Sequence, residues 1–159
     1  MEIFSEVKLT KLPEMKVVSA SKVSENPEEE VIGFLCKWLQ SRGYDLESRR
    51  GFGFDIPVSE EDKFAGKRGY EYWITIEEDL AGDDEVSIKT IAADDYAFLR
   101  IKEPFSDTFE RIGQGWQLLA GEVGQMSQEK CSCGNESRYC LEEVVIEGDM
   151  TYMDIYCPV

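Results

Sequence analysis

The sequence predicts an α+β fold: a tandem β-(β)-α-β-β repeat with pseudo-twofold symmetry, in which a strand–strand–helix–strand–strand unit occurs twice. Three observations support this prediction: a strand at residues 69–77 with regular alternation, two amphipathic helical segments, and similarity between the two halves of the chain. Two such halves would form a largely antiparallel sheet with both main helices on one face and a cleft between them.

The chain begins with two short strands, predicted at residues 7–12 and 15–19 and separated by a turn at Pro13 and Glu14. A helix is predicted at residues 27–42. Its apolar residues recur at helical spacing, at Val31, Ile32, Leu35, Trp38 and Leu39.

The boundaries of this first helix are marked by residues that favour helix ends. Asn26 is a candidate N-cap, Pro27 suits the first helical position, and Gly43 is a natural stop. A further strand at 46–54 is weakened by glycines, and residues 56–68 are predicted to form a loop.

The strand at 69–77 has two chemically different faces. Because side chains alternate along a strand, one face carries Tyr70, Tyr72, Ile74 and Ile76, and the other carries Glu71, Trp73, Thr75 and Glu77. Tyr72, Ile74 and Ile76 are predicted core residues. The face with Glu71 and Trp73 is either a half-exposed sheet surface or one wall of a ligand groove.

The second half repeats this pattern. Strands are predicted at 86–91 and 96–101, and a second helix follows Pro104, capped by Ser106 or Asp107. Its apolar stripe comprises Phe109, Ile112, Trp116, Leu119, Ala120 and Val123. Gly113 and Gly115 within it indicate that either the sheet or a ligand approaches closely. The last two strands are predicted at 139–146 and 151–156, after a loop at 125–137.

An internal repeat relates the two halves. Residues 7–12 align with 86–91 at an offset of 79 residues, and Trp38 aligns with Trp116 at an offset of 78. We therefore expect one domain over residues 1–159, with repeat one at about 3–80 and repeat two at about 84–159.

Composition excludes several classes of function. The net charge of −16 opposes direct nucleic-acid binding and favours a cationic ligand or a basic protein partner. The absence of histidine excludes Ser-His-Asp and Cys-His catalysis within this chain. No signal peptide or membrane span is recognisable, and five cysteines without secretory context favour a reducing cytoplasm, so a cytoplasmic location is expected.

Several segments together resemble a known family. They are the start Val7-x-Leu9-x-x-Leu12-Pro13, the aromatic strand around Tyr70, Leu141-Glu142, and the closing segment 154–159. This pattern resembles the GyrI-like small-molecule-binding domain, the effector-binding domain of AraC- and MerR-type regulators, in a free-standing form. The resemblance covers nearly the whole chain and implies a tandem strand–helix–strand–strand repeat with a central cleft.

The resemblance also implies site residues. A glutamate of the penultimate strand commonly faces the cleft, and Glu142 is the best match, with Glu143 as the next candidate. The tyrosine often found two places later is Val144 here, which is a departure from the family pattern. An aromatic residue of the last strand also contributes, and Tyr156 matches it.

The first functional hypothesis is binding of a hydrophobic, planar, cationic small molecule, for drug or toxin sensing or sequestration, without a cofactor. The expected ligand-binding residues are Trp38, Tyr70, Glu71, Trp73, Trp116, Glu142 and Tyr156. The alternative is a hydrolase of cyclopropane-bearing or similar electrophilic genotoxins, an activity that the resemblance implies, with Glu71, Glu142 and Tyr70 as catalytic residues. A third hypothesis is an acidic module that binds a basic protein surface.

Cys131-x-Cys133 and Cys140 suggest a metal site only superficially. Zinc prefers four ligands and usually a longer spacing between the first two cysteines, and no histidine can complete the set. We therefore predict no bound metal.

Overall fold

A computed structural model describes residues 2–126 and 139–159 and has the predicted α+β architecture with antiparallel strands. The chain divides into two compact units. The central unit is Glu14–Ala92. The terminal unit combines Met1–Pro13 with Ala93–Val159.

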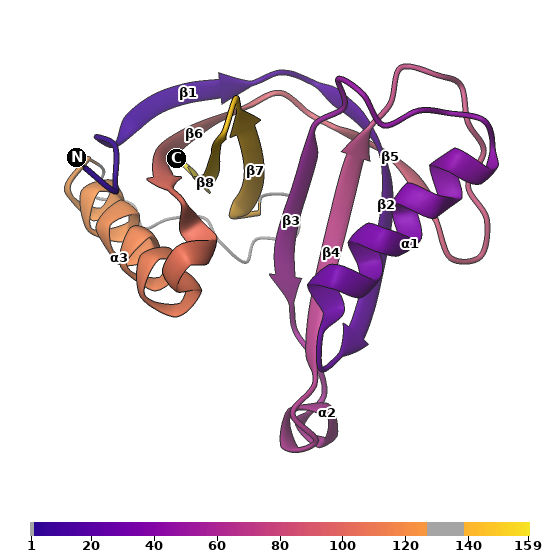
Figure 1. The fold of residues 1–159 in the computed structure, drawn as a ribbon, viewed down its shortest axis with the longest axis horizontal. Helices are drawn as coiled ribbons and strands as arrows, with labels where there is room; N and C mark the ends of the chain where they lie inside the picture. The colour runs from indigo at the N-terminus through magenta and orange to yellow at the C-terminus, as the bar shows by residue number, and fades with distance from the viewer. Residues whose placement is uncertain (1, 127–138) are drawn as a thin grey trace. The chain divides into compact units, whose positions relative to one another are not determined.

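The central unit is a four-stranded antiparallel sheet covered by one main helix (Figure 1). The strand order is β3-β4-β2-β5. Helix α1 packs along β2 and β4. The elements are β2 (Met15–Ser24), α1 (Pro27–Ser41), β3 (Gly51–Ile56), α2 (Glu60–Phe64), β4 (Arg68–Thr75) and β5 (Ser87–Ile91).

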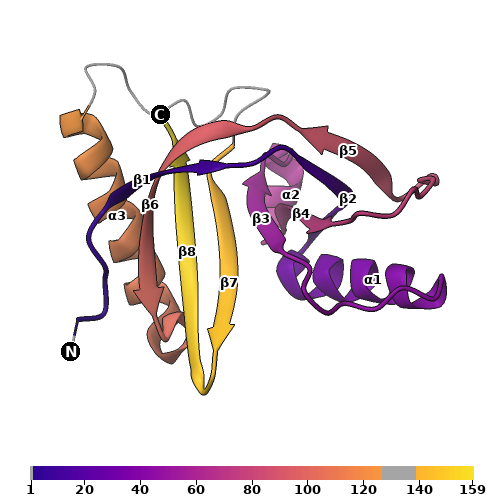
Figure 2. The same cartoon turned by 90° about the horizontal axis from the view of Figure 1, so that it is seen from above.

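The terminal unit has the same plan (Figure 2). Its antiparallel strand order is β1-β6-β8-β7, and α3 packs against β6 and β8. The elements are β1 (Lys8–Leu12), β6 (Asp94–Lys102), a 3-10 helix η1 (Pro104–Asp107), α3 (Thr108–Met126), β7 (Leu141–Glu147) and β8 (Met150–Pro158).

The first strand of each repeat pairs with a strand of the other repeat. Strands β1 and β5 begin 79 residues apart, at Lys8 and Ser87, which matches the offset expected from the sequence. Strand β1 pairs with β6, whereas β5 pairs with β2. The compact units therefore do not coincide with segments that are contiguous repeats in the sequence.

The α1 side of the central sheet forms a hydrophobic core. Tyr70, Ile74 and Ile76 are buried there, and Tyr72 packs against them, as the alternation of the strand predicted. Gly51 and Gly53 give space to the tyrosine rings: a Cβ at Gly51 would lie 1.9 Å from the Tyr72 hydroxyl oxygen, and one at Gly53 would lie 2.0 Å from that of Tyr70. The glycines that weakened the strand prediction are thus part of its packing.

The α3 side of the terminal sheet forms a second core. It includes Leu99, Ile101, Leu119 and Ile155, with Trp116 partly buried against it. A Cβ on Gly115 would lie 2.6 Å from Cδ1 of Ile101, so at this position it is the sheet that approaches the helix. Nothing lies within 4 Å of the corresponding point on Gly113.

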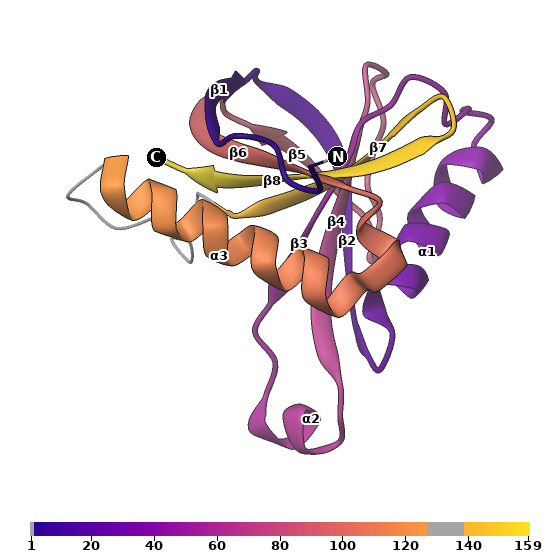
Figure 3. The ribbon, with the colours of Figure 1, turned by 60° about the vertical axis from the view of Figure 1, so that its left-hand side comes forward.

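Several element boundaries differ from the sequence predictions. Strand β3 begins at Gly51 and not near Leu46, and the predicted loop at 56–68 contains the short helix α2, capped by the Ser59 hydroxyl (Figure 3). The 3-10 turn η1 precedes α3, which starts at Thr108. Asn26 occupies the N-cap of α1, but its side chain makes no capping hydrogen bond. No helix within the described residues is long and apolar enough to cross a membrane.

Candidate functional site

The central sheet places Glu71 and Trp73 on the face opposite α1. Cross-strand pairing sets Ser19 opposite Trp73, so their side chains share that face. Oε2 of Glu71 accepts three hydrogen bonds: from Trp73 Nε1 at 2.6 Å, from Lys89 Nζ at 2.8 Å and from the Ser19 hydroxyl at 2.9 Å. These four residues come from β2, β4 and β5, and we call them the Glu71 cluster.

The Glu71 cluster combines a shielded ring with a solvent-facing end. The Trp73 ring is 1% exposed and makes an edge contact with Phe54, at 5.0 Å between centroids. The Glu71 side chain is 16% exposed and that of Lys89 is 39% exposed. Lys89 therefore forms the solvent side of the cluster.

The terminal sheet carries an aromatic cluster with a carboxylate on the face opposite α3. The Tyr156 hydroxyl donates a hydrogen bond to Oε1 of Glu143 at 2.8 Å. The Tyr156 ring stacks on Phe98, with centroids 5.8 Å apart and planes at 24°, and meets Tyr96 edge-on at 6.0 Å. Tyr96, Glu143 and Tyr156 are each at most 5% exposed. We call these four residues the Tyr156 cluster.

An ion pair lies beside the Tyr156 cluster. Arg100 donates to both carboxylate oxygens of Asp154, at 2.7 and 3.0 Å, and reaches Glu147 at 3.2 Å. The hydrogen bond from Arg100 to buried Asp154 raises the pKa of the guanidinium further above its ordinary value. Arg100 is therefore a permanent positive charge on this face.

Equivalent strand positions relate the two clusters. Ser19 opposite Trp73 corresponds, at the offset of 79 residues, to Phe98 opposite Tyr156. In the same alignment Glu71 corresponds to Asp154, whose partner is Arg100. Each unit thus has an aromatic donor and a carboxylate paired with a cation at equivalent positions.

The other predicted site residues lie on the helix-covered faces. Trp38 is buried against the α1 core, where its Nε1 donates to Asp83 at 2.9 Å and the Arg42 guanidinium lies 3.7 Å from its ring centroid. Tyr70 is buried in the same core. Trp116 packs on the α3 side of the terminal sheet.

Glu142 and Glu143 point to opposite faces of β7. Glu142 pairs across the strands with Ile155, a residue of the α3 core, whereas Glu143 pairs with Asp154. Glu143 is 5% exposed and bonded to Tyr156, and Glu142 is more exposed. Of the two glutamates considered from the sequence, the buried one that contacts the aromatic cluster is Glu143.

The expected ligand-binding and catalytic residues do not all converge. Glu71 and Trp73 are in contact, whereas Tyr70 lies on the other face of β4 from Glu71. The sequence analysis missed Ser19, Lys89, Tyr96 and Phe98, which contribute from neighbouring strands. Strand alternation together with pairing register could have identified them, but the register is not written in any single segment.

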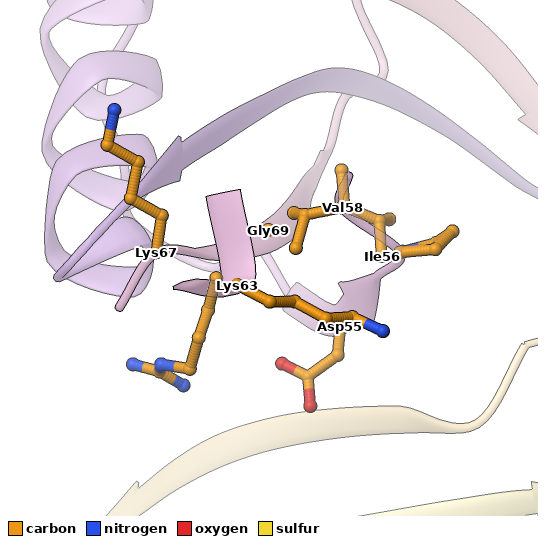
Figure 4. A pocket seen from close by; sticks show the side chains of 8 residues that line it. Asp55, Ile56, Val58, Lys63, Lys67 and Gly69 are labelled. Atoms are coloured by element: carbon orange, nitrogen blue, oxygen red, sulfur yellow. The ribbon is translucent and has the colours of Figure 1, made fainter. Parts of the chain in front are cut away.

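A separate pocket of about 230 Å³ lies where β3 leaves the sheet and β4 enters it (Figure 4). Ile56, Pro57 and Val58 supply apolar lining, and Lys63, Lys67, Arg68 and Asp55 supply charges. Arg68 is engaged in two hydrogen bonds with Glu28, at 2.6 and 2.9 Å. Desolvation and the nearby charge of Glu28 raise the pKa of Asp55, against the opposing effect of Arg68. This pocket has mixed charge and lacks an aromatic wall.

The cysteines considered as metal ligands can be assessed only in part. Cys131 and Cys133 lie outside the described residues. Among residues 2–126 and 139–159, no group of three or more cysteine, aspartate or glutamate side chains is arranged to hold a metal ion.

Comparison with known proteins identifies the family. The family model described as "Cass2: Integron-associated effector binding protein" matches residues 8–159. No curated protein sequence matches the chain significantly.

Solved structures share the fold at low sequence identity. EcmrR, in a complex with DNA, matches with a TM-score of 0.68 and 12% identity; the match covers 99% of this chain and 59% of the EcmrR chain. SAV2435 bound to tetraphenylphosphonium matches with a TM-score of 0.54 and 20% identity, over 98% of this chain and 94% of that one. The integron cassette protein VCH_CASS2 of Vibrio cholerae matches with a TM-score of 0.53 and 9% identity, covering 98% and 97% of the two chains.

Proposed function

The chain belongs to the family of integron-associated effector binding proteins, which makes it a small-molecule-binding protein, and we propose that its ligand is a planar, hydrophobic cation bound at the Tyr156 cluster. Such binding would serve to sense or sequester a drug or toxin. The observation that carries the proposal is a buried carboxylate, Glu143, held by a tyrosine within a wall of aromatic rings.

The chemistry of this cluster suits a hydrophobic cation. Aromatic faces attract cations through their quadrupoles, and their apolar area favours a flat ligand. A buried carboxylate is costly without a partner, so a cation that reaches Glu143 gains a strong electrostatic contact. Asp154 nearby is already paired with Arg100, which leaves Glu143 as the acceptor we assign to the ligand.

The comparison with SAV2435 supports the class of ligand. That protein was solved with tetraphenylphosphonium, a cation surrounded by aromatic rings. Its chain and this one align over nearly their full lengths. The identity of the natural ligand is not implied by this likeness, so tetraphenylphosphonium serves here as a probe.

Adjacent glutamates provide a matched test. Titration calorimetry with tetraphenylphosphonium is expected to show binding to the wild type and at least about tenfold weaker binding to Glu143→Gln, because a charge-assisted contact is lost. Glu142→Gln removes the same charge from the opposite face and is expected to leave affinity unchanged. Triphenylphosphine oxide, which is neutral, should bind both variants and the wild type equally weakly.

Two results would contradict the proposal. One is wild-type affinity for tetraphenylphosphonium in Glu143→Gln, which would remove this carboxylate from the site. The other is loss of binding in Glu142→Gln alone, which would move the site to the α3 side of the terminal sheet. Thermal unfolding of both variants without ligand controls for loss of the fold.

A further inference from the structure

The central unit contains a cation contact made by its own chain. Lys89 of β5 places its ammonium 2.8 Å from Oε2 of Glu71, and the same oxygen accepts the hydrogen bond from Trp73. The arrangement therefore has the three components of a site for an aromatic cation: a carboxylate, a ring and a positive charge.

We infer that the Glu71 cluster is a second cation-accepting site, filled in the wild type by the ammonium of Lys89. This inference deepens the proposed function and rests on it for the class of ligand. Lys89 then determines specificity: because it satisfies Glu71, the central unit does not take a cationic ligand, and only the terminal unit does.

The equivalence of the two sheets supports this inference. Glu71 and Asp154 occupy corresponding positions, and each is paired with a cation of the chain itself. The cations come from different strands, Lys89 from β5 and Arg100 from β6. Pairing of this carboxylate is thus common to both units although the residue that supplies the charge differs.

The geometry also shows how the site could be opened. Glu71 uses only Oε2 for its three hydrogen bonds, and no partner within the described residues is recorded for Oε1. No buried side-chain oxygen or nitrogen of the described residues lacks a partner, so Oε1 is accessible. The Lys89 side chain is 39% exposed, so truncating it leaves a vacancy that is open to solvent.

Truncation of Lys89 provides the test. The Lys89→Ala variant is titrated with phenyltrimethylammonium, and binding is followed by quenching of tryptophan fluorescence and by the rise in melting temperature. We expect at least about tenfold tighter binding than to the wild type, because the ligand replaces the missing ammonium next to Trp73. The gain should disappear in Lys89→Ala/Glu71→Gln, and the quenching should disappear in Lys89→Ala/Trp73→Phe. tert-Butylbenzene, the neutral isostere, should gain little.

Matched variants separate this effect from a general change of charge. Lys37→Ala removes a positive charge from the exposed side of α1 and should bind the probe as the wild type does. Lys89→Arg keeps the resident cation and should keep the site closed. Lys89→Gln removes the charge but keeps a hydrogen-bond donor, and serves if the alanine variant does not fold.

The outcomes distinguish this inference from the proposed function. Equal affinity for phenyltrimethylammonium in the wild type, Lys89→Ala and Lys89→Gln would overturn the inference, even if tetraphenylphosphonium binds through Glu143. If the wild type binds no hydrophobic cation, the proposed function fails. A gain in Lys89→Ala that depends on Glu71 would still support the second site in that case.

Discussion

Trp73 of β4 and Tyr156 of β8 occupy equivalent positions in the two sheets, and each donates a hydrogen bond to a carboxylate on the face without a helix. The donor–acceptor distances are 2.6 Å from Trp73 Nε1 to Glu71 and 2.8 Å from the Tyr156 hydroxyl to Glu143. The carboxylates come from different positions: Glu71 is two residues from Trp73 on the same strand, whereas Glu143 lies on the neighbouring strand β7. The two repeats therefore conserve the type of contact but not the residue that accepts it.

Removal of the Tyr156 hydroxyl is predicted to destabilise the protein without ligand. Tyr156→Phe withdraws a donor from Glu143, which is 5% exposed, and should lower the free energy of unfolding by about 1–3 kcal/mol. Urea denaturation measures this change. Tyr152→Phe, in the same strand, is the control and should change stability by less than about 0.5 kcal/mol. Equal effects in both variants would contradict the importance of the bond to Glu143.

Two glycines of α3 are predicted to respond in opposite directions to the same substitution. Gly113→Ala meets nothing within 4 Å and should stabilise the protein by about 0.5–1 kcal/mol through helix propensity. Gly115→Ala places its Cβ 2.6 Å from Cδ1 of buried Ile101 and should destabilise by about 1–3 kcal/mol. Thermal unfolding of both variants measures the contrast, and stabilisation by Gly115→Ala would show that α3 packs less closely than described.

The Arg49–Glu78 pair is predicted to contribute stability that depends on pH. The hydrogen bond from Arg49, at 2.9 Å to Oε1, lowers the pKa of Glu78 from 4.5 to about 2. Because the folded-state pKa is depressed, the contribution is fully present above about pH 4.5 and is lost as the pH falls towards 2.

Melting temperatures of the wild type and Glu78→Gln over this pH range test that prediction. The difference between them should be constant above about pH 5 and should shrink as the pH falls from about 4.5 to 2. Glu77→Gln, which alters the exposed neighbouring carboxylate, is the control. A difference that persists unchanged at pH 2 would contradict the assignment to this pair.

Trp38 is predicted to stabilise the fold without contributing to ligand affinity. Trp38→Phe loses the hydrogen bond to Asp83 and part of the buried ring, at a cost of about 1–3 kcal/mol. The hydrogen bond from Trp38 is also the main reason that the pKa of Asp83 is lowered. Chemical denaturation should therefore detect the variant, while its affinity for tetraphenylphosphonium should stay within about twofold of the wild type. A larger loss of affinity would place Trp38 in the site.

Much of the fold could be predicted from local patterns. Helix α1 begins at Pro27 as expected, and the spacing of strands 7–12 and 86–91 anticipated the equivalence of β1 and β5. The exchange of these strands between repeats could not be predicted, because it depends on which distant strands form hydrogen bonds with each other. The short helix α2 was missed because its turn is polar and has no apolar stripe to mark it.

For the candidate site, the sequence by itself determined which side chains share a face: alternation separates Glu71 and Trp73 from Tyr70, and Glu142 from Glu143. Only the tertiary structure decided which of those faces meets a helix and which neighbouring strands complete the other, as Lys89 does for Glu71 and Tyr156 for Glu143. The physical reason is that alternation is a property of one strand, whereas burial and pairing are properties of strands brought together from far apart in the chain.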